Sequence, residues 1–204
     1  QPESEQLPGS AKDWYCSQKW VDVSNQKIDV VWSSIEAPLI QLCNINTGKW
    51  LENITLDNGT IISYIMNNYW WTNSPASQSG RFRFNYHIRS FKPPFNSVRA
   101  YNFGWESHVP LIAFFVDSAK AKNKIKEYSF FNDLPDNVLI IGVKRSENDK
   151  GMIVRLLEIS GIESIFSFNV NFKKIKSAFN TTPVEDIITS LKVDNTGVKI
   201  KLKP

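Results

Sequence analysis

Hydrophobic and polar residues alternate with a two-residue period in several short segments of the chain, which is the pattern of half-buried β-strands. The clearest case is residues 81–91, whose predicted core face carries Phe82, Phe84, Tyr86 and Ile88. Its predicted outer face carries Arg81, Arg83, Asn85, His87 and Arg89. The same period recurs in residues 166–172 and 198–202. The pattern therefore predicts strands in both the first and the last part of the chain.

Further strands are predicted at residues 20–23, 27–32, 111–116, 138–144 and 152–159. Turn-forming residues such as Asn58-Gly59 and Pro93-Pro94 separate the strands. Helical signals are scarce. Residues 183–191 are predicted to form one or two helical turns, with Thr182 as N-cap and Glu185 in the capping-box position. The sequence thus predicts an all-β protein.

Four alternating lysines, from Lys120 to Lys126, separate an aromatic-rich first part from a lysine-rich second part. This change of composition predicts a domain boundary between residues 118 and 119. We expect two β-sandwich-like domains, at residues 1–118 and 119–204.

The composition is that of a globular protein, with 42% hydrophobic, 22% charged and 13% aromatic residues. The net charge of +4 is uneven, because residues 119–204 hold 15 basic and 10 acidic side chains. A solvated, lysine-rich sheet face explains this excess as well as a nucleic-acid partner does. No apolar run approaches the ~20 residues that span a bilayer. We expect neither a nucleic-acid nor a membrane partner.

Metal-ligating side chains are few, since the chain has only Cys16, Cys43, His87 and His108 of the two usual types. They do not suffice for a histidine-rich zinc centre or a four-cysteine site. The cysteines allow one bridge, and two buried thiols are the favoured alternative. We expect no cofactor in this chain, and we expect its polar N-terminus without an initiating Met to mark a processed or excised piece.

A long set of motifs resembles the C-terminal β region of glycoside hydrolase family 38, the α-mannosidases. The central motif is MNNYWWTNSPASQSGRFRFNY at residues 66–86. Upstream and downstream of it, in the expected order, stand QKWVDV, EAPL, NTGKW, GWE, PL, VKRSE and IVRL, between residues 18 and 156. The resemblance covers most of the chain from about Trp14 onward.

This resemblance implies the later part of a β-supersandwich in residues 1–118, followed by a smaller terminal β-sandwich in residues 119–204. It also implies that the zinc ligands and the nucleophilic carboxylate lie in a larger N-terminal catalytic domain outside this chain. Whether this chain takes part in catalysis is therefore uncertain, and no catalytic residue is assigned to it. The full-length enzyme would be a retaining hydrolase that uses zinc and acts on a mannose-containing glycan.

Four carboxylic acids near aromatic residues in the sequence are candidate catalytic acids: Asp13, Asp22, Glu36 and Glu106. Glu106 stands close to Trp105 and His108, and burial there would raise its pKa. A glycosidase needs two carboxyl groups at a defined separation. The sequence names no partner for any of the four, so a structural role is favoured.

The segment Asn67–Asn73 is the sharper candidate for substrate contact, through Asn68, Tyr69, Trp70 and Asn73. Amide groups hydrogen-bond sugar hydroxyls, and aromatic rings stack on the C–H faces of pyranoses. The alternative is that Tyr69 and Trp71 fill the core while the asparagines satisfy turn backbone. A mainly structural role is favoured, with part of the loop lining a cleft against the catalytic domain.

Other charged patterns have simpler explanations. Solvation or domain docking explains the Arg81–Arg89 face, and a solvated edge explains the alternating lysines from Lys199 to Lys203. Three N-x-[ST] sequons, at Asn53, Asn58 and Asn180, indicate exposed loops if the protein is secreted in a glycosylating host.

The leading hypothesis is thus the non-catalytic C-terminal β portion of an α-mannosidase-like enzyme, with its own N-terminal catalytic domain as partner. The alternative is a stand-alone carbohydrate-binding β-sandwich, suggested by the aromatic content alone.

Overall fold

A computed structural model describes residues 7, 14–46, 51, 54–66, 73, 77–116 and 127–204. Contacts divide the chain into two compact units, Gln1–Leu111 and Ile112–Pro204. The predicted boundary after residue 118 falls in the range 117–126, outside the described residues, and it stays a prediction. In the described part of the chain every regular element except α2 is a strand, which confirms the all-β class.

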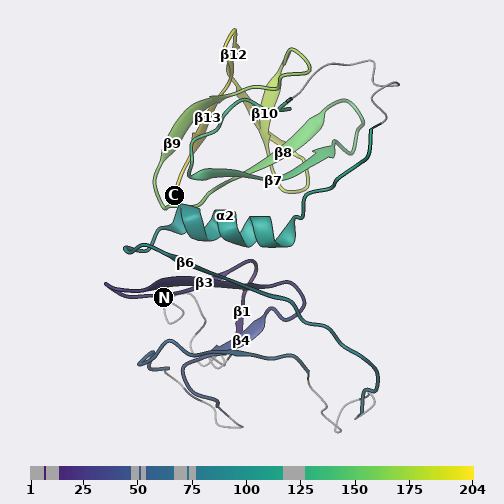
Figure 1. Ribbon diagram of the computed structural model, residues 1–204. Coiled ribbons are helices and arrows are strands. Elements are labelled where there is room, and N and C mark those ends of the chain that lie inside the picture. The colour runs from purple at the N-terminus through teal and green to yellow at the C-terminus, as the bar shows by residue number, and fades with distance from the viewer. Residues whose placement is uncertain are drawn as a thin grey trace. The chain divides into compact units, whose positions relative to one another are not determined.

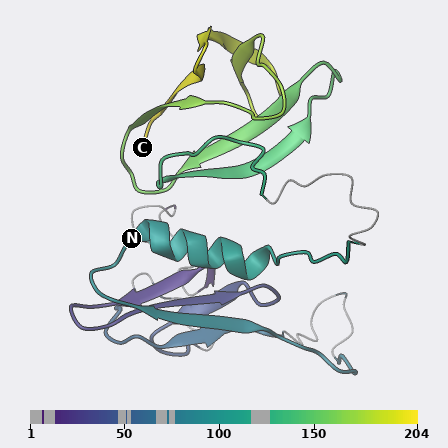
Figure 2. The same cartoon turned by 45° about the horizontal axis from the view of Figure 1, so that its top comes forward.

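The first unit contains six described strands and one described helix. They are β1 Tyr15–Cys16, β2 Val21–Ser24, β3 Asp29–Ser34, β4 Leu39–Leu42, β5 Ile61–Ser63, β6 Tyr86–Phe91 and α2 Ser97–His108. The strands form two antiparallel sheets, of order β1-β4-β5 and β2-β3-β6. Figures 1 and 2 show α2 across one face of the β2-β3-β6 sheet and the other sheet on the opposite side.

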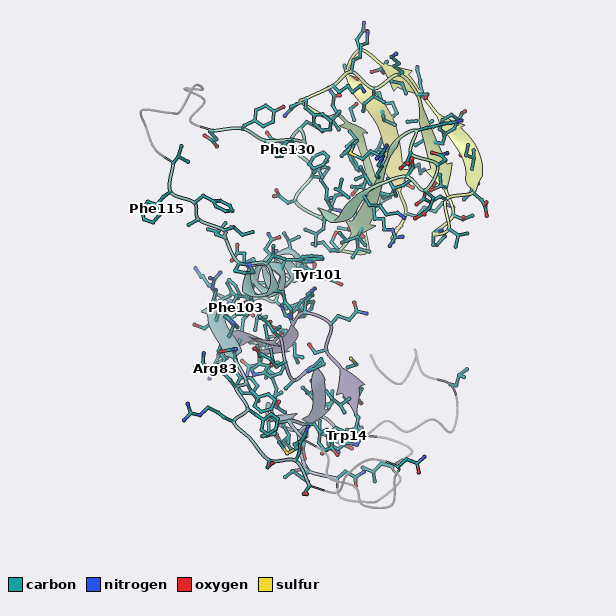
Figure 3. The ribbon with its side chains drawn as sticks, turned by 90° about the vertical axis from the view of Figure 1, so that its right-hand side faces the viewer. Trp14, Arg83, Tyr101, Phe103, Phe115 and Phe130 are labelled. Carbon is teal, nitrogen blue, oxygen red and sulfur yellow. The ribbon has the colours of Figure 1, made fainter. Side chains whose placement is uncertain are left out.

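The helix α2 has a clear local origin. The Asn96 side chain accepts a hydrogen bond from Arg99 N at 3.0 Å, as an N-cap does. Gly104 lets the helix approach the chain before β2, because a Cβ there would lie 3.0 Å from both Lys19 Cβ and Trp20 Cδ1. On the sheet side of α2, Ala100 and Phe103 pack with Val31 in a buried cluster (Figure 3).

Two predictions for residues 81–91 were wrong. The strand β6 covers only Tyr86–Phe91. Of the predicted core face Phe84 is half-buried, but Phe82, Tyr86 and Ile88 are exposed, and within β6 the face of His87 and Phe91 is the more buried one. The physical reason is α2, which the sequence analysis missed. It covers the other face, where Arg89 stands opposite Val31 in the register of β3 and β6 and lies over the Phe103 ring.

The described residues of the second unit form seven strands. They are β7 Val138–Arg145, β8 Met152–Glu158, β9 Ser164–Phe168, β10 Ala178–Thr181, β11 Ile187–Leu191, β12 Val193–Asp194 and β13 Gly197–Leu202. They pair as β7-β8, β10-β11 and β12-β13-β9, all antiparallel. Its buried apolar residues are Val138, Ile159, Phe168, Val170 and Val198. Figure 1 shows the three sheets of this unit close together.

Two further element predictions were also wrong. Residues 111–116 form no strand, and residues 183–191 form a tight turn followed by β11 instead of a helical turn. In that turn Glu185 has a left-handed backbone, with φ 73°. Its carboxylate reaches Lys144 and Glu147 N instead of capping a helix. The same Thr–Glu spacing that caps a helix can therefore also form a hairpin turn.

Phe103→Ala should lower the free energy of unfolding of the first unit by ~3–5 kcal/mol, because it removes a ring from the buried cluster. Ile88→Ala on the exposed face should change it by less than ~0.5 kcal/mol. All seven tryptophans lie in the first unit, so denaturant unfolding followed by tryptophan fluorescence reports on that unit. Equal effects of the two changes would contradict the assignment of the buried face.

Candidate functional site

The loop predicted to contact substrate lies mostly beyond what the structure describes. Asn68, Tyr69 and Trp70 are outside the described residues, and Asn73 is exposed. Its contact with substrate stays a prediction.

The candidate acids separate once their surroundings are seen, although Asp13 is outside the described residues. Glu36 accepts hydrogen bonds from the backbone N and the side-chain Nδ2 of Asn85, at 2.9 and 2.6 Å, and these bonds lower the pKa of Glu36. The side chain of Glu106 is not buried; it is 65% exposed and forms an ion pair with Arg89 at 3.3 Å. Neither group is arranged for proton transfer.

Asp22 does have a carboxylate partner, which sequence reasoning missed. Asp29 lies two residues from Asp22 across the β2–β3 hairpin, on the same face, because Ser24 pairs with Asp29 and Asp22 pairs with Val31. The two side chains are close enough for Asp29 to raise the pKa of Asp22. Asp29 is 2% exposed, and Arg99 Nη2 of α2 lies 3.3 Å from its Oδ2. The hairpin register was the signal that could have revealed this pair.

The surroundings of Asp22 favour the neutral form of its carboxyl group. Asp22 Oδ2 and Asp29 Oδ1 are buried and have no hydrogen-bond donor among the described residues. Two ionised carboxylates in contact repel each other, whereas one protonated group donates to the other. Burial, the contact with Asp29 and the charge of Asp29 raise the pKa of Asp22, although the Ser24 hydroxyl opposes this by donating to Asp22 Oδ1.

This pair is structural and not a glycosidase couple. Retaining enzymes hold their two carboxyl groups ~5–5.5 Å apart, with the glycosidic bond between them. Asp22 and Asp29 touch, and they lie on the sheet face that α2 covers, so no sugar fits between them. The pair fastens the β2–β3 hairpin to the helix through Arg99.

Two carboxylates of the second unit also serve the fold. Glu158 accepts hydrogen bonds from the Ser160 hydroxyl, Asn137 Nδ2 and the backbone N of Gly161. The Ser160 hydroxyl bond is the main reason why the pKa of Glu158 falls to about 2. Glu185 pairs with Lys144 at 2.8 Å, and this contact is the main cause that lowers the pKa of Glu185.

Metal-ligating groups do not gather in the described residues. No cluster of three His, Cys, Asp or Glu suited to a metal ion occurs in that part of the chain. Both cysteines are free thiols; Cys43 is buried as expected, but Cys16 is exposed. His108 Nδ1 lies 2.8 Å from Gly104 O and 3.4 Å from Ser33 Oγ, so it belongs to the α2 interface. Among the described residues no helix is long and apolar enough to cross a bilayer.

The comparison with protein families found a match to the larger part of the second unit. Residues 137–204 match the family model described as "Glycosyl hydrolases family 38 C-terminal beta sandwich domain". This part of the chain is thus similar to the C-terminal β-sandwich domain of that family, and the match supports the predicted α-mannosidase-like C-terminal domain. No match to the chain was found among curated proteins or among solved structures. The resemblance of residues 18–136 to the family stays a prediction.

Asp22→Asn should raise the melting temperature of the first unit more at about pH 7.5 than at about pH 4. The pKa of Asp22 is raised in the folded state, so the folded chain keeps its proton to higher pH than the unfolded chain. The stability that this proton contributes is lost as pH rises through the folded pKa. Asparagine donates to Asp29 at every pH. Tryptophan fluorescence melts measure this difference.

The matched control is Glu158→Gln in the second unit. The pKa of Glu158 is lowered to about 2, so its stabilising bonds weaken as pH falls below the ordinary carboxyl range. Its substitution should leave the tryptophan-detected pH dependence unchanged. A stabilisation by Asp22→Asn that is the same at both pH values would contradict the raised pKa of Asp22.

Proposed function

We propose that this chain is the non-catalytic C-terminal β portion of an α-mannosidase-like glycoside hydrolase, which packs against the catalytic domain of that enzyme and lines its glycan cleft. The family match of residues 137–204 carries the proposal. The order of motifs from residue 18 to residue 156 supports extending it to the first unit. The carboxylates described above all serve the fold, which supports a non-catalytic role.

An exposed apolar run supports the packing role. Residues 111–116 form no strand, and their large side chains are almost fully exposed: Leu111 101%, Ile112 78%, Phe114 82%, Phe115 110% and Val116 74%. Figure 3 shows Phe115 on an extended segment outside any sheet. An apolar run of this kind exposed on a folded protein usually marks an interaction surface. The partner that we propose for it is the catalytic domain of the same polypeptide.

The zinc ion that the family resemblance implies does not fit the described residues, because they offer no cluster of ligands. In this proposal the metal and the reacting carboxylates belong to the catalytic domain, and the substrate is a mannose-containing glycan. Sequencing the gene upstream of Gln1 tests this directly. An upstream reading frame that encodes a catalytic domain supports the proposal, and a stop codon followed by a start codon next to Gln1 refutes it.

Phe114→Ser with Phe115→Ser should leave the stability of the isolated chain nearly unchanged, because both rings are already exposed. In the full-length enzyme the same change should lower the melting temperature by several degrees, because burial against the catalytic domain is lost. Val184→Ser, another exposed apolar position, is the control and should have no effect in either protein. Equal small effects in both proteins would remove the packing role of this segment.

Alanine substitutions at Tyr69, Trp70 or Asn73 of the full-length enzyme should lower kcat/KM for an aryl α-mannoside and leave the melting temperature near wild type. A lost substrate contact acts on transition-state binding and not on the core. If the rings instead fill the core, the melting temperature should fall by several degrees while the folded fraction keeps its kinetics. Paired melts and kinetics decide between cleft and core.

A further inference from the structure

The second unit has a hollow between the loop that follows β9 and the hairpin of β12 and β13. Its volume is about 430 Å³, and its lining includes Asn171, Phe172, Lys173, Lys174, Asp194 and Asn195. That volume is in the range of small-ligand sites. None of these residues takes part in the contacts described so far for either unit.

The shape of the hollow follows from the close approach of two backbones. Gly197 has φ 120°, and a Cβ on it would lie 2.3 Å from Phe168 O. Only glycine fits there, so the start of β13 packs directly against the backbone at the end of β9. Asp194 accepts hydrogen bonds from the backbone N and the hydroxyl of Thr196 and thereby fixes the turn. The hollow is thus built into the hairpin.

One wall of the hollow is aromatic. The Phe172 side chain is 51% exposed, and its ring packs edge-on against Phe130, with 6.1 Å between ring centroids. Phe130 packs in the same way against Tyr128, at 5.3 Å, and both rings are also exposed. Figure 3 marks Phe130 in this unit. A supported, exposed ring is the surface on which the C–H face of a sugar stacks.

The polar groups in the lining favour an anionic ligand. Lys173 and Lys174 form no ion pair with any described residue. The only acid in the lining, Asp194, accepts hydrogen bonds from Thr196. These bonds are the main cause that lowers the pKa of Asp194, and the charges of Lys199 and Lys192 have smaller effects. Asp194 is therefore held in its own turn, and neither lysine has a carboxylate partner among the described residues.

An amide completes the set. Asn171 Nδ2 donates to the carbonyl oxygens of Ser129 and Phe131, at 3.0 and 3.1 Å. These bonds orient the side chain, and its Oδ1 accepts no hydrogen bond from a described residue. An oriented acceptor of this kind suits a sugar hydroxyl.

We propose that this hollow binds an anionic saccharide, with the sugar ring against Phe172 and the anionic group between Lys173 and Lys174. The site lies wholly in the second unit and needs no catalytic domain, so its test is independent of the function proposed above. The shared chemistry is a pyranose that carries a phosphate, sulfate or carboxylate group.

Titration of the full chain with glucose 6-phosphate, followed by amide NMR shifts, tests the proposal. We expect saturable shifts at residues 171–174 and at Asn195, with a Kd about tenfold or more below that of either glucose or inorganic phosphate alone. Glucose 6-sulfate and glucuronate, the other two sources of the charge, should bind at the same residues. Raising the salt concentration should weaken binding, because the lysines are exposed. Equal binding of inorganic phosphate would show only a basic surface, and equal binding of glucose would remove the role of the lysines.

Variants separate the site from the general surface. Phe172→Ala and the double change Lys173→Ala with Lys174→Ala should each weaken glucose 6-phosphate binding by about fivefold or more. Phe172→Tyr keeps a ring and should keep binding, which guards against a folding defect in the alanine variant. Lys150→Ala and Phe179→Ala, an exposed lysine and an exposed ring elsewhere in the unit, should bind as wild type. Weakening by the controls to the same degree, or no binding by the wild-type chain, overturns the proposal.

Discussion

The ion pair between Asp29 and Arg99 is the contact on which the first unit depends. The β2-β3-β6 sheet is small, and the described apolar cluster under α2 has only Val31, Ala100 and Phe103 as its buried members. A buried carboxylate in this layer is costly unless it is paired. Arg99 supplies the pair and also donates to Lys92 O and Pro94 O, at 3.0 and 2.6 Å. One guanidinium thus joins the helix, β3 and the chain between β6 and α2.

The second unit solves the same problem of a thin core in another way. It has no described helix, and two glutamates fasten its hairpins. Glu158 accepts from backbone and side-chain donors at the end of β8, and Glu185 bridges the β10–β11 turn to Lys144 at the end of β7. Both acids have a lowered pKa, whereas the pKa of Asp22 in the first unit is raised. Acid therefore acts on the two units in opposite directions through these groups, and the linkage of each has its own sign.

Several strands were predictable, because β13 carries the two-residue period and β3, β7 and β8 are rich in valine and other strand-favouring apolar residues. The helix was not. Ser97–His108 has no acid in its first turn and a glycine at 104, and its buried side is narrow. The Asn96 cap was the available signal. Because α2 was not predicted, the wrong face of β6 was predicted to be buried. A strand with apolar residues on both faces buries the face on which another element packs. The Asp22–Asp29 pair required the hairpin register, which no single-segment pattern supplies.

The candidate binding residues lie in an irregular segment and do not follow the periodic pattern of the strands. Phe172, Lys173 and Lys174 are consecutive, and a strand would send them to alternate faces. They line one hollow because the chain leaves β9 and bends there, after the close approach of Gly197 to Phe168. Periodicity cannot detect a site made by an irregular segment. Since the hydrogen-bonded carboxylates described above serve the fold, function is to be sought in such surface segments and not in buried acids.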